Sequence, residues 1–347
     1  EPTATDNCTS QANLVWEKSH LPGAAFGIGT TVVTYRVKDE SGNWSSSCSF
    51  NIIVNDNIPP TAVCKNATIA LNGSGSATLV PADVNNGSFD NCTAQENLNI
   101  LLSKTIFDCS DKGNNTVVVT VSDASGNQNT CNAIVTVEDN LPPTVISTIG
   151  TVNTTVNNSP GKCYYTVSGS QFDPSVTDNC VGSVLYYEVT GATTLSGSGS
   201  LTSKQLNKGV NNVVWTAIDA SGNPSVNSVS FTVTVNDNQS PSITGRSNQT
   251  KNVDPTKCFY TVQGTEFDPV SYSDNCSIVT VTYNVTGVTQ MSGTSTLAGK
   301  TFDVGVSNLT WTVSDGTNQS TTSFKITVID NVFPEITEIA DIEETNE

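Results

Sequence analysis

One short linker motif recurs along the chain and sets its organisation. An acidic residue and an asparagine follow an apolar strand-like run and precede proline in VNDNIPP (54–60), VEDNLPP (137–143), VNDNQSP (235–241) and VIDNVFP (328–334). Proline cannot donate a backbone hydrogen bond to a sheet and holds the chain extended, so each copy is expected to end one folded unit and begin the next. Self-similarity at a fixed spacing is the signature of a repeat protein.

The linker aspartates predict three complete modules of 83, 98 and 93 residues, flanked by two partial ones. The predicted boundaries are 1–56 (the C-terminal part of a first module), 57–139, 140–237, 238–330, and 331–347 (the start of a fifth). Two further motifs repeat with them. Asp-Asn-Cys begins at 6, 90, 178 and 274, and a D-x-x-G-N turn begins at 39, 123 and 219, with a shortened form at 315. Asp-Asn-Cys comes so early in the first module that about thirty residues of that module are expected to precede the sequence.

Each module shows the period-two alternation of a strand with one buried face. Before the second D-x-x-G-N turn, Val117, Val119 and Val121 share one parity, and the positions of the other parity are mostly polar, such as Thr120 and Ser122; the strand before each linker behaves in the same way. Trp215 and Trp311 fall on the inward parity of the equivalent strands. About seven such strands per module predict an all-β fold of tandem immunoglobulin-like β-sandwiches in an elongated array. A β-propeller would need about four strands per 40 residues and fits less well.

Charge and histidine content exclude several classes of function. The net charge of −18 disfavours nucleic acid and anionic membrane surfaces as partners, and favours cations. No apolar run reaches the roughly 18 residues that a membrane helix needs, so no membrane insertion is expected. One histidine in the whole chain leaves little material for His-centred catalysis, and carboxylates that recur once per module behave as structural features. We therefore expect no enzyme.

Ten cysteines predict disulfides and an oxidising, extracellular compartment. Cys64 and Cys131 are replaced together in the next two modules, by Ser147 with Val229 and by Gly245 with Thr322, which predicts that they bond each other. Aligning the Asp-Asn-Cys motifs predicts three more pairs within modules: Cys92 with Cys109, Cys163 with Cys180, and Cys258 with Cys276. Cys8 and Cys48 are expected either to bond residues that precede the sequence or to bond each other.

The acidic motifs predict a cation site at each module boundary. In a sandwich, the Asp-Asn-Cys loop, the D-x-x-G-N turn and the preceding linker all lie at one end. Three carboxylates would then meet, with a linker asparagine adding a carbonyl oxygen, and Ca²⁺ accepts six to eight such oxygens in adaptable geometry. The predicted ligands are Asp56, Asn57, Asp90 and Asp123; Asp139, Asn140, Asp178 and Asp219; and Asp237, Asn238, Asp274 and Asp315. The alternative is that these residues only shape turns, because Asp, Asn and Gly are ordinary turn formers.

Several of these segments resemble a known family. PTATDNC, TVVTYRVKDESGN, CSFNIIVNDNIPP and NNGSFDNC are similar to hyalin repeat (HYR) modules, which are immunoglobulin-like extracellular repeats. KTIFDCSDKGNNTVVVTVSDASGN followed by VEDNLPP resembles repeats of giant Bacteroidota surface proteins, above all the gliding-motility adhesin of the SprB type. The resemblance implies the stalk or filament of an adhesin exported by type 9 secretion and attached to the outer membrane. Its implied partners are the motility and secretion machinery and, through other parts, an extracellular surface or glycan.

The sequence suggests one mechanism for such a stalk and one alternative function. Calcium at proline-stiffened joints would lock neighbouring modules, in a manner similar to cadherin linkers. The alternative function is carbohydrate or ligand binding by individual modules, for which Trp16 and Trp44 are the exposed aromatic candidates.

Overall fold

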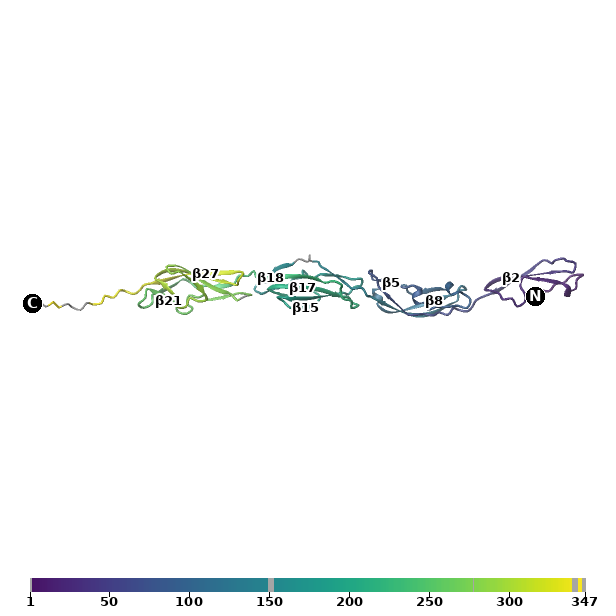
Figure 1. The fold of residues 1–347 in the computed structure, drawn as a ribbon, viewed down its shortest axis with the longest axis horizontal. Coiled ribbons are helices and arrows are strands. Elements are labelled where there is room, and N and C mark those ends of the chain that lie inside the picture. Colours follow the sequence, from purple (N-terminus) through teal and green to yellow (C-terminus); the bar gives the residue numbers. More distant parts are fainter. Residues whose placement is uncertain (1, 149–152, 277, 339–342, 345–347) are drawn as a thin grey trace. The chain divides into compact units, whose positions relative to one another are not determined.

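The computed structural model describes residues 2–148, 153–276, 278–338 and 343–344. Figure 1 follows the chain from its purple N-terminus to its yellow C-terminus. It divides into two compact units: one comprises Glu1–Leu141 with Asp178–Gly182, and the other comprises Pro142–Thr177 with Ser183–Glu347. In the described residues no helix is long and apolar enough to cross a membrane.

The first unit begins with a three-stranded antiparallel sheet that follows a short 3-10 turn, η1 (Gln11–Asn13). Its strands are β1 (Val15–Lys18), β2 (Gly29–Lys38) and β3 (Cys48–Val54), in the order β1-β2-β3. Val33 and Tyr35 of β2 are buried, and the Tyr35 ring lies between Trp16 at 6.1 Å and Phe50 at 6.0 Å between centroids. Trp16 is thus half-buried by aromatic packing.

The rest of the first unit is a β-sandwich over residues 60–141. Its larger sheet has the order β4-β9-β8-β6, in which β4 is parallel to β9 and the other pairs are antiparallel. The smaller sheet pairs β5 with β7. The elements are β4 (Ala67–Ala70), β5 (Ser76–Thr78), α1 (Pro81–Val84), η2 (Gln95–Asn97), β6 (Asn99–Leu102), β7 (Ile106–Asp108), η3 (Cys109–Asp111), β8 (Gly113–Ser122) and β9 (Gln128–Glu138).

The second unit holds two sandwiches with the same strand order. The first has a five-stranded sheet in the order β11 (Thr154–Asn157), β18 (Val229–Asn236), β17 (Gly209–Ile218), β14 (Val184–Gly191) and β15 (Leu195–Ser198). Two further strand pairs complete it: β10 (Thr144–Ile146) with β13 (Ser175–Thr177), and β12 (Tyr164–Thr166) with β16 (Gln205–Asn207). The second repeats this with β20 (Gln249–Asn252), β27 (Gln319–Ile329), β26 (Gly305–Ser314), β23 (Thr280–Gly287) and β24 (Met291–Thr294), and with β19 (Ser242–Thr244) on β22 (Ser271–Ser273) and β21 (Phe259–Thr261) on β25 (Thr301–Asp303).

The core of each sandwich contains the residues that the alternation predicts to be buried. Val117, Val119 and Val121 are fully buried in the first unit, and Trp215 and Trp311 are fully buried in the second. Both tryptophans meet a tyrosine of the neighbouring strand edge to face, with centroids 5.3 Å apart. Such aromatic pairs add stabilisation beyond their buried area. The predicted all-β fold of tandem immunoglobulin-like β-sandwiches is confirmed.

The hydrophobic cores fall within the predicted modules, with one exception. The core of residues 71–137 also contains Cys180, which lies beyond the predicted boundary at 139. The boundaries themselves stay predictions. Residues 331–338 of the predicted fifth module form no strand, and residues 339–342 and 345–347 of that module lie outside the described residues.

Candidate metal centre

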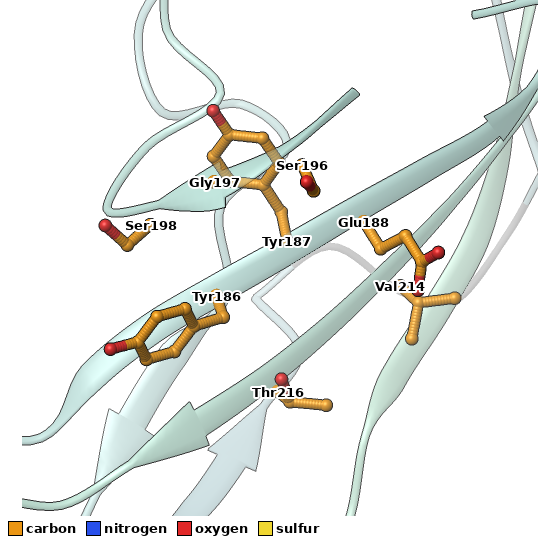
Figure 2. A pocket seen from close by; sticks show the side chains of 8 residues that line it. All are labelled: Tyr186, Tyr187, Glu188, Ser196, Gly197, Ser198, Val214 and Thr216. Atoms are coloured by element: carbon orange, nitrogen blue, oxygen red, sulfur yellow. The ribbon is translucent and has the colours of Figure 1, made fainter. Parts of the chain in front are cut away.

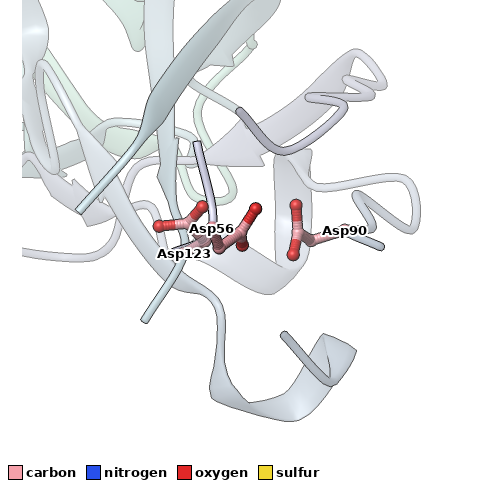
Figure 3. A group of neighbouring side chains, drawn as sticks. All are labelled: Asp56, Asp90 and Asp123. Carbon is pink, nitrogen blue, oxygen red and sulfur yellow. The ribbon is translucent and has the colours of Figure 1, made fainter. Parts of the chain in front are cut away.

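Three carboxylates from separate loops meet in the first unit. Asp56 follows β3, Asp90 begins the Asp-Asn-Cys loop, and Asp123 follows β8. One oxygen from each lies within 4.8 Å of the others, and Figure 3 shows the three side chains together. Asp56 and Asp123 are buried, with 8% and 7% of their surface exposed, and Asp90 is half-buried. The sequence predicts this group, here called the Asp56 group.

Hydrogen bonds within each loop hold the carboxylates in place. One oxygen of Asp90 accepts from the backbone N–H groups of Cys92 (2.9 Å) and Thr93 (2.7 Å). Asp123 accepts from the backbone N–H of Asn127 at 2.8 Å and from its side-chain amide at 2.7 Å. The two loops are tied together because the backbone N–H of Ala124 donates to Thr93 Oγ1 at 3.1 Å. The aspartates therefore do shape turns, as the alternative interpretation expects.

The turns do not use every oxygen. Asp56 Oδ2 and Asp90 Oδ1 are buried and have no hydrogen-bond partner among the described residues. Two unit charges about 5 Å apart repel by about 3 kcal/mol at an effective dielectric near 20. A buried carboxylate oxygen without a donor is costly unless a cation satisfies it. Turn formation alone leaves this arrangement unexplained, whereas an oxygen-binding cation would complete it.

The surroundings of the Asp56 group shift the pKa of two side chains, those of Asp123 and Cys92. Burial alone would raise the pKa of Asp123, but the hydrogen bonds from the side chain and backbone of Asn127 lower it below its ordinary value. Burial, reinforced by the negative charges of Asp56, Asp90 and Asp123, raises the pKa of the Cys92 thiol. The lowered pKa favours the ionised form of the Asp123 carboxylate, which is the form that binds a cation.

A second group of three, Asp237, Asp274 and Asp315, meets within 4.8 Å in the second unit and is here called the Asp237 group. It differs from the first in holding an internal counter-ion. Lys208 Nζ donates to Asp237 Oδ2 at 3.1 Å, and the side-chain amide of Asn158 donates to Asp237 Oδ1 at 3.0 Å. Hydrogen bonds from Asn318 offset the effect of burial and lower the pKa of Asp315.

The third predicted set is divided between the two units, with Asp139 and Asp178 in the first and Asp219 in the second. Each part makes contacts like those of the Asp56 and Asp237 groups. In the first unit Asp139 accepts from the side-chain amide of Asn179 at 3.0 Å and lies 3.8 Å from Lys112 Nζ. In the second unit Asp219 accepts from the backbone N–H of Asn223 at 2.8 Å and from its side-chain amide at 2.7 Å, as Asp123 does from Asn127.

The linker asparagines lie differently from the linker aspartates. Asn57, Asn140 and Asn238 are exposed, because successive residues of an extended chain point to opposite sides. The Asn140 amide donates to Glu138 at 3.2 Å. Their proposed role as ligands stays a prediction. The asparagine that contacts the Asp56 group is Asn127, whose amide also donates to the carbonyl oxygen of Asp56 at 3.1 Å.

The disulfides agree with the sequence in one case and differ in three. Cys64 bonds Cys131, as predicted, with Cα atoms 5.9 Å apart. The predicted pairs Cys92–Cys109, Cys163–Cys180 and Cys258–Cys276 are wrong. The structure instead joins Cys109 to Cys180 and Cys163 to Cys276, and it leaves Cys8, Cys48, Cys92 and Cys258 as free, exposed thiols.

The physical reason is the position of the Asp-Asn-Cys loop. In two of these loops the cysteine, Cys180 or Cys276, bonds a cysteine beside a strand end of the preceding sandwich, Cys109 or Cys163. Cys180 is accordingly buried, with 4% exposed, in a core formed by residues 71–137. The signal available in the sequence was the change of partner position between Cys109, which directly follows β7, and Cys163, which directly precedes β12.

A hollow of about 400 Å³ lies on the sheet of β14, β15 and β17, and its lining shares no residue with the acidic groups. Figure 2 shows its lining, which includes the Tyr186 ring, the carboxylate of Glu188 and the hydroxyl groups of Ser196, Ser198 and Thr216. Of the predicted exposed aromatics, Trp44 has 44% of its surface exposed, and the Arg36 guanidinium lies 4.3 Å from its ring centroid.

Comparison with known proteins agrees with this architecture. Residues 1–54 match the HYR domain. Hyalin of Strongylocentrotus purpuratus is 32% identical over 351 residues, covering 94% of this chain and 25% of hyalin. Hyalin of Lytechinus variegatus is 32% identical over 156 residues, covering 42% of this chain and 27% of hyalin. The chain thus spans about a quarter of the length of these curated relatives. These matches support the predicted HYR repeats.

Solved structures that resemble the chain include two cadherin ectodomains. Mouse cadherin-23 EC22-24 is 16% identical, covers 78% of this chain and 99% of its own, and has a TM-score of 0.33. The protocadherin GammaB4 extracellular domain is 15% identical, covers 91% of this chain and 59% of its own, and also has a TM-score of 0.33.

Proposed function

We propose that this chain is a structural repeat region of an extracellular adhesion protein, and that calcium binds at its module boundaries and stiffens them. The observation that carries the calcium site is the Asp56 group, in which two buried carboxylate oxygens have no donor among the described residues. The HYR match and the similarity to hyalin support repeats of this class. Disulfides within and between sandwiches support an oxidising, extracellular location.

The donor set favours calcium over magnesium. Three carboxylates come from three loops, and the carbonyl oxygen of Asp56 lies in the same region, so the ligands are all oxygen and come from separate irregular segments. Ca²⁺ accepts such sets at variable geometry, whereas Mg²⁺ requires a near-ideal octahedron and keeps several waters. Asp56, Asp90 and Asp123 would hold the ion, which would neutralise their mutual repulsion.

A matched pair of variants tests the site. Asp123→Asn removes one charge from the Asp56 group, and Asp39→Asn makes the same change in the equivalent turn of the first module, where Asn43 binds Asp39 in the same way. We expect calorimetric calcium binding and a calcium-dependent rise in Tm for the wild type and for Asp39→Asn. Asp123→Asn should lose one bound ion. No heat of binding and no effect of EDTA on Tm would reject the site.

The mechanical part of the proposal needs a separate measurement. If calcium stiffens the joints, small-angle scattering should report a narrower range of conformations with calcium than with EDTA, and Asp123→Asn should reduce the difference. If calcium binds but the scattering does not change, the calcium site is supported and the proposal that calcium stiffens the joints is rejected.

A structural role, rather than a catalytic one, accounts best for acidic groups that repeat at module ends. The narrower role in gliding motility, with type 9 secretion, attachment to an outer membrane and contact with the motility machinery, remains a prediction of the sequence resemblance. Deleting these modules from the parent gene should then stop surface gliding while secretion continues. If gliding is unchanged, the role in motility is rejected and only the role in adhesion is retained.

The second candidate is glycan binding at the hollow beside β14. One exposed aromatic ring, a carboxylate and three hydroxyl groups line it, which are groups that bind sugars. A selective glycan-array signal that Tyr186→Ala abolishes would favour this function. A repeat region that only transmits force should show no selective signal.

A further inference from the structure

The disulfides Cys109–Cys180 and Cys163–Cys276 form at the same place on their sandwiches, the end of a short strand pair. The bonded cysteine flanks one strand of this pair in the first case and the other strand in the second. In the sandwich of residues 60–141, Ser76 of β5 pairs with Asp108 of β7, so Gly75 and Cys109 flank the same end of this pair. A Cβ on Gly75 would lie 2.8 Å from Cys109 Sγ and 2.6 Å from the carbonyl oxygen of Asn179. Both positions therefore face the incoming Asp-Asn-Cys loop.

The next sandwich has the same arrangement with the cysteine on the other strand. Tyr164 of β12 pairs with Asn207 of β16, so Cys163 takes the place of Gly75, and Lys208 takes the place of Cys109. Here Cys163 bonds Cys276 of the next Asp-Asn-Cys loop. The same loop is held by its asparagine, because the side-chain amide of Asn275 donates to the carbonyl oxygen of Lys162 at 2.8 Å.

The last sandwich presents this surface a third time. Phe259 of β21 pairs with Asp303 of β25, which places Cys258 at the position of Cys163. The preceding turn also matches: the backbone N–H of Lys257 donates to the carbonyl of Asp254 at 3.0 Å, as Lys162 does to Ser159 at 2.9 Å. Cys258 is a free and exposed thiol.

We infer that Cys258 is a docking site for the Asp-Asn-Cys loop of a module that follows Asp330 in the same polypeptide, and that the two cysteines form a disulfide. The argument is continuity with two established bridges. Cys109–Cys180 and Cys163–Cys276 both join a strand end to the Asp-Asn-Cys loop next along the chain. The carbonyl of Lys257 occupies the place of the Lys162 carbonyl and would accept the asparagine of that loop.

The bond forms by ordinary thiol oxidation. Two thiols lose two protons and two electrons and form one S–S bond, and a disulfide oxidant such as oxidised glutathione takes up the electrons through a mixed disulfide. The docked loop raises the effective concentration of one thiol near the other, so the correct pair should form in preference to bonds with Cys8, Cys48 or Cys92.

The test extends the full chain through Asp330 with a second copy of residues 238–330 and refolds it with oxidised and reduced glutathione. Peptide mapping without reduction should find Cys258 of the original module bonded to the copied Cys276 in most molecules. In a Cys258→Ser variant the copied Cys276 should react with a thiol reagent. A free copied Cys276 in the unmodified extension, or disulfide-linked dimers in its place, would overturn the inference.

A second variant checks the docking position inside the chain itself. Cys163→Gly with Lys208→Cys moves the thiol to the position that Cys109 occupies in the preceding sandwich. We expect the thiol at position 208 to bond Cys276. Failure of that bond, in protein whose circular dichroism matches the wild type, would show that the position is not shared by the two strands.

Discussion

At the scale of single residues, the Asp237 group contains two side-chain donors to its linker aspartate, Lys208 and Asn158. The Asp56 group has two buried oxygens without a partner among the described residues, whereas Lys208 Nζ lies 3.1 Å from Asp237 Oδ2 in the Asp237 group. An ammonium at that distance offsets part of the repulsion that a bound cation would otherwise relieve. The lysine and a cation therefore compete for the same carboxylate.

The competition predicts that Lys208→Met binds calcium more tightly at the Asp237 group. The ion pair is partly exposed, and such pairs contribute about 0.2 to 1 kcal/mol, so the gain in calcium affinity should be about 1.4-fold to fivefold. Tm without calcium should fall slightly. Calorimetry in a background with both Asp123→Asn and Asp219→Asn isolates this group, and Lys204→Met is the control for a change of net charge. Weaker binding in Lys208→Met would contradict the competition.

A second residue-scale prediction concerns acid stability. Burial acts to raise the pKa of Glu266, but hydrogen bonds from Lys251 and Tyr260 lower it below its usual value of 4.5. A lowered folded-state pKa contributes stability above the unfolded-state pKa, and this stability is lost as pH falls through the folded-state value.

Glu266→Gln should therefore cost about 1 kcal/mol of unfolding free energy at pH 7. The difference from wild type should shrink below about pH 4.5, as the wild-type carboxyl becomes protonated. Urea unfolding at a series of pH values measures it, and Lys251→Met should remove most of the same pH dependence. A difference that stays constant down to about pH 3 would show that packing, and not charge, is the cause.

At the scale of elements, repetition predicted most of the fold. Period-two alternation marked Val117, Val119 and Val121 as buried, and correlated replacement identified the Cys64–Cys131 bridge. The meeting of Asp56, Asp90 and Asp123 followed from which loops share an end of a sandwich.

The other disulfides could not be predicted by the same means. Comparing repeats assumes that equivalent residues bond within one module, and the Asp-Asn-Cys cysteine bonds across a boundary. The partner thiol also moves, from directly after β7 at Cys109 to directly before β12 at Cys163, so no single position of the repeat contains it. Only the pairing of β5 with β7 and of β12 with β16 shows that these are neighbouring positions.

The correlated replacement predicts that the lost bridge can be restored. A Cβ on Gly245 would lie 3.0 Å from Thr322 Cβ and 2.1 Å from its hydroxyl, so once the hydroxyl is removed the two Cβ atoms need to move apart by only about 0.5 Å to reach disulfide spacing. Gly245→Cys with Thr322→Cys should form a bond and stabilise the last sandwich by about 2 to 4 kcal/mol.

Gly245→Ala alone supplies the control, because its methyl group would clash with Thr322 and should cost about 1 to 3 kcal/mol. Calorimetric unfolding with and without reductant separates the two effects. A double variant that is oxidised yet no more stable than wild type would contradict the prediction.

At the scale of the whole molecule, the three disulfides enclose overlapping stretches of chain. Cys64–Cys131 closes a sequence separation of 67, Cys109–Cys180 one of 71, and Cys163–Cys276 one of 113. Because each interval begins before the previous one ends, force applied to the two termini meets a covalent shortcut almost continuously from Cys64 to Cys276. Unfolding under load would then lengthen the chain far less than its residue count implies.

Single-molecule stretching of the oxidised chain measures this shortcut directly. The separations of 67 and 113 are hidden from extension, about 180 residues in all, so the fully unfolded oxidised chain should be about 630 Å shorter than the reduced chain at about 3.5 Å per residue. Removing one bridge tests the overlap. Cys64→Ser with Cys131→Ser should free only about 30 residues, about 100 Å, because the path through Cys109–Cys180 replaces the lost shortcut. Release of all 67 would mean that the Cys109–Cys180 bond is absent and that the bridges act one module at a time.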